Sequence, residues 1–322
     1  MRYLVTGARG FIGSAIVRAA LNAGHSVAAL VRAGQTADRL SGVANNVTFI
    51  HSEFTELRSS TTRDAFLAYA PDVVVHAAWE GVSAAERNAD WQAERNVPAA
   101  FELLMLAADV GANHFIGLGS QAEYGPCSGR ISEHQPLCPT TLYGVAKVSA
   151  CAVTQKAAMA RGLKHSWLRV FSTYGACSEP GWVLPMAANT MARGVAPALT
   201  PCEQRWEFLH VSDAARAVVA VGERGATGAY NLGSSDARPL RDVLLALRDR
   251  IDPSVMPHFG AVAYRPDQVM YLEADITRLQ NATGWFPKTS LESGLDEIAN
   301  EALEREARSR EALAHRRRLA HA

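Results

Sequence analysis

A glycine-rich turn at the start of the chain constrains its fold more than any other stretch. The first fourteen residues read MRYLVTGARGFIGS, in which an apolar run meets three glycines before the pattern becomes helical. This order predicts a buried strand that turns tightly into a helix. Gly7 permits the turn, Gly10 lets the phosphates of a ligand approach the backbone, and Gly13 lets the helix pack closely on the strand. Because a helix N-terminus presents unpaired N–H groups to a pyrophosphate, we expect a dinucleotide site that includes Phe11 and Ile12.

Composition and charge exclude several classes of protein. Lys and Arg together number 32, as do Asp and Glu, so there is neither a basic excess for nucleic acid nor an acidic excess. No apolar segment approaches the roughly 20 residues that span a bilayer, and the N-terminus reads as a strand rather than a leader peptide. The five cysteines, without C-x-x-C spacing, predict reduced thiols and no metal site. We therefore expect a cytoplasmic protein without a nucleic-acid or membrane partner.

Strands and helices alternate along the chain, which predicts a parallel sheet with right-handed crossovers. Expected strands cover 3–5, 25–31, 47–51, 73–75, 113–118 and 165–170, and expected helices cover 15–23, 62–69, 96–111 and 149–160, with Tyr143 at the start of a helix. The pattern then loosens, with helices at 186–193, 240–251 and 291–307 and strands at 206–211 and 230–233. The expected fold class is α/β, a Rossmann-type doubly wound parallel sheet with a smaller mixed C-terminal substrate lobe. Residues 1–172, with a returning strand near 229–233, are the expected dinucleotide-binding domain, and 173–322 form most of the lobe.

The end of the second predicted strand indicates which dinucleotide is bound. An acidic side chain there binds the adenosine ribose of NAD, whereas an arginine nearby accommodates the 2′-phosphate of NADP. Here Val31 is followed by Arg32, and Arg9 in the glycine turn is a second planar cation. Either arginine alone could be an ordinary solvated side chain, but together they favour NADP(H) over NAD(H). Glu53, after the third strand, is a candidate partner for the adenine amino group.

Three polar residues fall where the predicted strands meet the ligand crevice, at the carboxyl ends of the sheet. The fifth strand runs into Ser120, and Tyr143 and Lys147 follow at a spacing that places them on one face of a helix. Small residues at Ala77 and Ala78 let the backbone lie against the cofactor. An unperturbed tyrosine titrates at about 10, so a neighbouring ammonium is needed to bring its pKa towards working pH. Taken alone, the Tyr-x-x-x-Lys pair also fits a packed tyrosine beside a surface lysine.

The sequence resembles the extended short-chain dehydrogenase/reductase family, and specifically its nucleotide-sugar branch. The resemblance covers most of the chain and rests on VTGARGFIG, DVVVHAA, SQAEYG, YGVAK, LRVFSTYG, EFLHVSDAARA, YNLG, and RPDQ with GWFP. In that family tyrosine is the general acid or base, lysine binds the nicotinamide ribose and lowers the tyrosine pKa, and serine holds the substrate oxygen. The resemblance therefore implies these roles for Tyr143, Lys147 and Ser120, with the hydride carried by the nicotinamide.

The resemblance also implies contacts to a nucleotide sugar. Ser172 stands where the family commonly has asparagine, and Arg205 and Arg265 match arginines that bind the nucleotide diphosphate, although each also fits a structural ion pair. Glu123 either orients the sugar or caps the turn after Ser120. Relatives dimerise through the helix bearing Tyr143 and the one around Phe101, which implies a homodimer. The expected substrate contacts are Trp79, Gln121, Glu123, Ser172, Arg205 and Arg265.

The positions after Ser120 separate the reactions of this branch. Its dehydratases have an Asp-Glu pair there, and the double-epimerising reductase of GDP-fucose synthesis has a cysteine at the second position, whereas this chain has Gln121 and Ala122. Epimerases of the UDP-galactose type hold NAD and normally have the acidic residue that the second strand here lacks. SQAEYG and HAAWEG are similar to NDP-4-keto-6-deoxysugar reductases, of which CDP-abequose and CDP-paratose synthases are examples.

Three hypotheses follow from these positions. The first is an NADPH-dependent reductase of the C4 keto group of a nucleotide-linked 4-keto-6-deoxysugar, in deoxysugar or surface-polysaccharide biosynthesis. The second is an NAD-dependent nucleotide-sugar 4-epimerase. The third is an NADP-sensing protein of the same fold without turnover, which the presence of Ser120, Tyr143 and Lys147 together disfavours.

Overall fold

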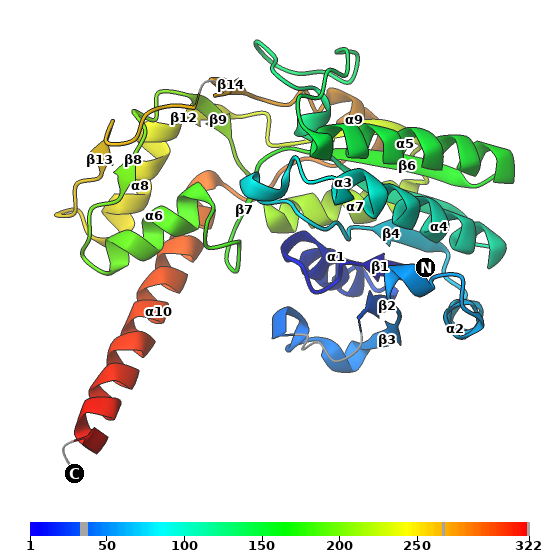
Figure 1. Ribbon diagram of the computed structural model, residues 1–322, viewed down its shortest axis with the longest axis horizontal. Helices are drawn as coiled ribbons and strands as arrows, with labels where there is room; N and C mark the ends of the chain where they lie inside the picture. Colours follow the sequence, from blue (N-terminus) through cyan, green and yellow to red (C-terminus); the bar gives the residue numbers. More distant parts are fainter. Residues whose placement is uncertain (33–37, 266–267, 321–322) are drawn as a thin grey trace.

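Seven parallel strands form the central sheet of the computed structural model, which describes residues 1–32, 38–265 and 268–320 (Figure 1). The strands are β1 (Arg2–Thr6), β2 (Ser26–Val31), β3 (Val47–His51), β4 (Val73–His76), β5 (His114–Ser120), β6 (Lys164–Val170) and β11 (Gly228–Leu232). Their spatial order is β3-β2-β1-β4-β5-β6-β11, so the order reverses between β1 and β4. Ligands of open α/β sheets bind at such a reversal, outside the carboxyl ends of the strands.

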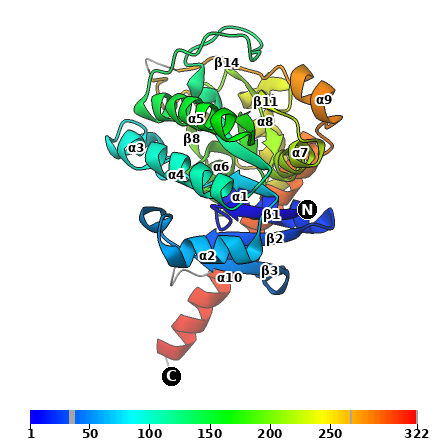
Figure 2. The same ribbon diagram turned by 90° about the vertical axis from the view of Figure 1, so that its right-hand side faces the viewer.

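Helices cover both faces of this sheet. On one face lie α1 (Phe11–Asn22) and α7 (Val211–Arg224), and on the other lie α2 (Ser60–Tyr69), α4 (Asn96–Asp109) and α5 (Leu142–Arg161), as Figures 1 and 2 show. The alternation of side chains along β1 explains the two layers, because Tyr3 and Val5 pack in the apolar cluster with Ile16 of α1, whereas Leu4 packs with Leu103 of α4. The predicted Rossmann-type doubly wound sheet is confirmed.

The remaining elements build a smaller lobe beside the carboxyl ends of the strands. Its apolar core joins α6 (Val183–Ala192), α8 (Leu240–Ile251) and the first turns of α10 (Leu291–Ala320), through Leu184, Leu244 and Ile298 among others. Short strands form three small sheets: β12 (Ala237–Pro239), β9 (Arg205–Glu207) and β14 (Tyr271–Leu272); β10 (Leu209–His210) with β7 (Thr173–Tyr174); and β13 (His258–Phe259) with β8 (Ala198–Leu199). Among the described residues, the short helices α3 (Trp91–Glu94) and α9 (Thr277–Thr283) complete the α-helices, and the far end of α10 projects away from the body (Figure 1).

Several boundaries differ from the expected ones. The strand expected over 206–211 is two strands, because the chain leaves the sheet of β9 at Phe208 and pairs with β7 at Leu209. Helix α1 begins at Phe11, directly after the turn, and α5 is one continuous helix from Leu142. Helix α10 extends past the expected end at 307 to Ala320. The returning strand is confirmed as β11, parallel to β6.

No helix in the described ranges is both long enough and apolar enough to cross a bilayer. Nor do those ranges contain a group of three or more His, Cys, Asp or Glu side chains that could hold a metal ion.

Candidate active site

The glycine turn lies at the point where the strand order reverses. Gly7 follows β1 with φ +64°, and a Cβ there would stand 2.6 Å from the backbone nitrogen of Ala78, which follows β4. A Cβ on Gly13 would stand 2.1 Å from the carbonyl oxygen of Gly7, so α1 packs directly on the turn. Gly10 is exposed, and α1 begins at the next residue. The turn therefore fits a dinucleotide, because Gly10 leaves the first N–H groups of α1 open to a phosphate.

The other expected cofactor contacts surround this turn. Ala78 donates its N–H to Thr6 Oγ1 at 3.2 Å, which holds the chain after β4 against β1. Arg32 is exposed immediately after β2, and the half-buried Arg9 has its carbonyl oxygen 3.3 Å from Arg39 Nη1. The remaining expected contacts are Phe11, which is buried, and Ile12, Glu53 and Ala77, which are half-buried.

Ser120, Tyr143 and Lys147 come together at the carboxyl end of β5. Tyr143 and Lys147 are 8% and 4% exposed and lie one turn apart in α5, and the Ser120 side chain is near enough to the Tyr143 phenol to lower its pKa. Lys147 Nζ donates to the carbonyl oxygen of Leu118 at 2.7 Å and stands 3.6 Å above the ring of Trp79. The structure thus juxtaposes a hydroxyl, a phenol and an amine at a strand end.

Burial dominates the electrostatics of these groups. It lowers the pKa of Lys147 to about 7, since the charged ammonium loses its solvation, while the charge of Glu123 opposes this shift. Burial likewise raises the pKa of Tyr143, against the opposing effects of the Ser120 side chain and the charge of Arg87. The family resemblance led us to expect Lys147 to lower the pKa of Tyr143. In this structure burial raises the pKa of Tyr143, because desolvation outweighs the charge of Arg87. The effect expected of Lys147 stays a prediction.

A hydrogen-bond network holds Trp79 over this cluster. Its Nε1 donates to Gln92 Oε1 at 2.9 Å, and Asn96 Nδ2 donates to the same oxygen at 3.2 Å. The ring of Trp79 meets that of Tyr143 edge to face, with 6.1 Å between centroids. The sequence analysis missed Gln92 and Asn96, because helical periodicity does not indicate that these two side chains form hydrogen bonds around Trp79.

Glu123 is turned away from the crevice and is fully buried. It accepts hydrogen bonds from the backbone N–H of Ser120 and from Trp167 Nε1, both at 2.9 Å, and pairs with Arg169 Nε at 2.8 Å. Of its two expected roles, the structure shows the cap of the turn after Ser120. The expectation that it contacts the sugar is not met here, since an ionised carboxylate in the core is stable only where such donors hold it.

The other expected substrate residues are spread over the junction of the sheet and the lobe. Ser172 Oγ accepts a hydrogen bond from Trp206 Nε1 at 2.5 Å, and Arg205 Nη2 donates to the carbonyl oxygen of Ala237 at 2.6 Å. Gln121 is half-buried in the turn after Ser120, and Arg265 is exposed beside the end of the described range 38–265.

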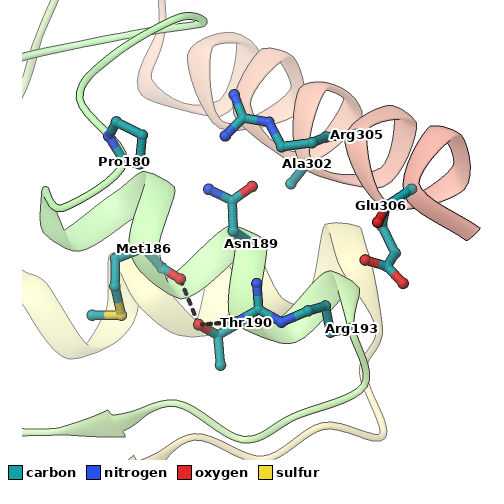
Figure 3. A pocket seen from close by; sticks show the side chains of 9 residues that line it. Pro180, Met186, Asn189, Thr190, Arg193, Ala302, Arg305 and Glu306 are labelled. Carbon is teal, nitrogen blue, oxygen red and sulfur yellow. Dashed lines mark hydrogen bonds between the residues drawn. The ribbon is translucent and has the colours of Figure 1, made fainter. Parts of the chain in front are cut away.

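Two cavities lie away from this cluster. One of about 820 Å³ is bounded by α1, α7 and the loop at Ala176. The other, of about 390 Å³, lies between α6 and α10, where Figure 3 shows Asn189 and Arg305 on the two facing helices. Neither is lined by Ser120, Tyr143 or Lys147, so we place the active site by its titratable groups rather than by cavity size.

Comparisons with known proteins show relatives over most of the chain. The chain is 26% identical over 330 residues to dTDP-glucose 4,6-dehydratase 1 of Escherichia coli K12, covering 92% of this chain and 91% of that protein. Its fold matches UDP-glucose 4-epimerase of Thermotoga maritima with a TM-score of 0.83 (24% identity, covering 94% and 98% of the two chains). It also matches the Thermus thermophilus UDP-glucose 4-epimerase complex with NAD, with a TM-score of 0.81 (25% identity, 94% and 99%).

A family profile also matches more than half of the chain. Residues 3–233, which include β1 to β6, β11 and the Ser120, Tyr143 and Lys147 cluster, match the profile of that family. This match confirms the resemblance drawn from the motifs. The chain belongs to the NAD dependent epimerase/dehydratase family.

Proposed function

We propose that the protein reduces the C4 keto group of a nucleotide-linked 4-keto-6-deoxysugar with NADPH. Bound NADPH would supply a hydride to C4, and with a proton from the protein on the carbonyl oxygen the ketone would become an alcohol, leaving NADP⁺. Ser120 and Tyr143 hold the carbonyl oxygen, and Tyr143 donates the proton to it. Lys147 binds the nicotinamide ribose and offsets the charge left on Tyr143.

The observation that supports reduction over dehydration is the pair of residues beside Ser120. Gln121 and Ala122 have no group that can move a proton, so the acid and base of a 4,6-dehydration are missing at these positions. The next carboxylate, Glu123, is no substitute, because Trp167 and Arg169 hold it in the core. Hydride transfer at one carbon is the chemistry that the cluster of Ser120, Tyr143 and Lys147 supports.

The choice of NADPH rests on the chain after β2. The last residue of β2 is the buried Val31, and the exposed Arg32 follows it, where a carboxylate would favour NAD. Arg32 with Arg9 provides positive charge for a 2′-phosphate. We expect Arg32→Asp to weaken NADPH binding relative to NADH, and an unchanged ratio of the two dissociation constants would remove this support.

A 4-epimerase that uses NAD is the second candidate, since the Thermus thermophilus epimerase shares this fold and is a complex with NAD. An epimerase returns the hydride to its own substrate, so it keeps its cofactor bound and consumes none. A reductase consumes one NADPH for each sugar. Cofactor that copurifies with the protein, together with no net NADPH oxidation, would favour the epimerase.

The decisive experiment is a substrate panel. CDP-, dTDP-, GDP- and UDP-4-keto-6-deoxysugars are incubated with the protein and NADPH, and the nicotinamide absorbance is followed. We expect oxidation of NADPH with at least one sugar and its loss in Tyr143→Phe. Unchanged oxidation in that variant would show that Tyr143 is not the proton donor.

We further propose how the chain divides these tasks. Residues 1–172 with the strand near 229–233 hold the cofactor, and the lobe within 173–322 closes on the nucleotide sugar, with Arg205 and Arg265 as the candidate diphosphate contacts. We also propose that two copies of the chain form a homodimer through α4 and α5, which cover the same face of the sheet. Sedimentation would measure the oligomeric state.

A further inference from the structure

Arg87 is tied to the catalytic helix by its backbone. It lies in the loop between β4 and α3, and its carbonyl oxygen accepts the N–H of Tyr143 at 2.8 Å. The neighbouring Asn88 accepts the N–H of Leu142 through Oδ1 at 3.1 Å. Two of the N–H groups that α5 leaves unpaired at its start are therefore satisfied by this loop. The position of residue 87 relative to Tyr143 is consequently independent of its side chain.

The guanidinium of Arg87 lies over the ring of Tyr143. Its Cζ is 5.4 Å from the ring centroid, within the range in which a cation is attracted to an aromatic face. The side chain is half-buried, its Nε is buried without a hydrogen-bond partner in the described chain, and no described carboxylate forms an ion pair with it. Among the described residues, therefore, no neighbouring carboxylate neutralises the charge of Arg87.

Three other groups that act on Tyr143 do not place an unpaired positive charge over its ring. Lys147 Nζ is 5.8 Å from the ring centroid, but it donates to the carbonyl oxygen of Leu118 and lies closer to Trp79. Ser120 lowers the pKa of the Tyr143 phenol, whereas the negative charge of Glu123, which is paired with Arg169, raises it. The charge of Arg87 favours the ionised form of Tyr143 and lowers its pKa.

We propose that Arg87 is a positioning residue that stabilises the phenolate of Tyr143 as its proton passes to the substrate oxygen. The inference rests on the proposed role of Tyr143 as proton donor. Addition of hydride to C4 places negative charge on the substrate oxygen, and the proton moves from the Tyr143 phenol to that oxygen. Negative charge then accumulates on the tyrosine ring beneath the guanidinium of Arg87. A cation held over that ring stabilises the charged state more than the neutral phenol.

The test compares Arg87→Gln with Arg87→Lys. For reduction, kcat falls at high pH as Tyr143 loses its proton before turnover. Removing the charge in Arg87→Gln should move this alkaline limb up by about half to one pH unit and lower kcat about threefold. Arg87→Lys should restore most of both effects. Because residue 87 bonds to α5 through its backbone, both variants keep the cap of that helix.

Arg95→Gln is the matched control, since its guanidinium lies 5.9 Å from the ring of Trp91 in the same part of the chain. An alkaline limb that stays in place in Arg87→Gln, as in Arg95→Gln, would overturn the proposal. A near-ultraviolet titration of the tyrosinate, with Tyr143→Phe subtracted, measures the same shift without any substrate. If no sugar is reduced, the proposed function fails, whereas this titration still decides whether Arg87 lowers the pKa of Tyr143.

Discussion

The carboxylate of Glu123 accepts the backbone N–H of Ser120 at 2.9 Å, while Ser120 Oγ accepts the N–H of Ala122 at 3.2 Å. This reciprocal capping box fixes the backbone at the strand end where the Ser120 hydroxyl meets Tyr143. The same carboxylate pairs with Arg169, which donates to Tyr124 Oη at 3.0 Å. A buried network of charged and polar side chains therefore stabilises the turn after Ser120 on the side that faces the core.

Removing the charge of Glu123 should destabilise the protein strongly. In Glu123→Gln the guanidinium of Arg169 stays buried without a counter-charge, which costs about 3–5 kcal/mol. Urea denaturation measures the free energy of unfolding. The double variant Glu123→Gln with Arg169→Gln should recover part of this loss, because the unpaired charge is gone. A double variant less stable than either single one would contradict this account.

Adding a methyl group at Gly7 should destabilise the protein more than the strain of a left-handed backbone alone would, and should also weaken cofactor binding. In Gly7→Ala the Cβ meets the backbone of Ala78 at 2.6 Å, in addition to the strain of φ +64°. Gly24→Ala is the matched control, since Gly24 has φ +79° and nothing within 4 Å of its Cβ. The control should lose about 1 kcal/mol and still bind NADPH, whereas Gly7→Ala should lose more than twice that and bind poorly. Thermal unfolding and cofactor titration measure the two effects, and equal losses would show that the contact is relieved without cost.

Stability should fall with rising pH because of Glu207. Burial raises the pKa of its carboxyl to about 7, from 4.5 for the unfolded chain. The folded state thus holds the proton more tightly, so this stabilisation is complete below pH 4.5 and is lost as pH rises through about 7. The predicted loss is at most about 3 kcal/mol, and Glu207→Gln should abolish it. Thermal unfolding at several pH values measures it, with the exposed Glu203→Gln as control. Identical pH profiles of wild type and Glu207→Gln would contradict the assignment.

Local signals predicted the central sheet well. Apolar runs such as Val73 to Val75 and the amphipathic pattern of α8 depend only on near neighbours, and these elements appear where expected. The split of the strand expected at 206–211 could not be predicted in the same way. A period of two residues indicates an extended chain, but which partner each half pairs with depends on Ser172 and Ala237, which are distant in sequence.

The sequence by itself determined the glycine turn, the parallel sheet and the helical spacing that places Tyr143 and Lys147 on one face, since each depends on backbone geometry over a few residues. Only the tertiary structure decided how charges are disposed around the phenol. It turned Glu123 into the core, directed Lys147 to Leu118, and placed Arg87 over Tyr143. These arrangements depend on burial and on partners contributed by separate elements, and no local pattern encodes the loss of solvation that governs them.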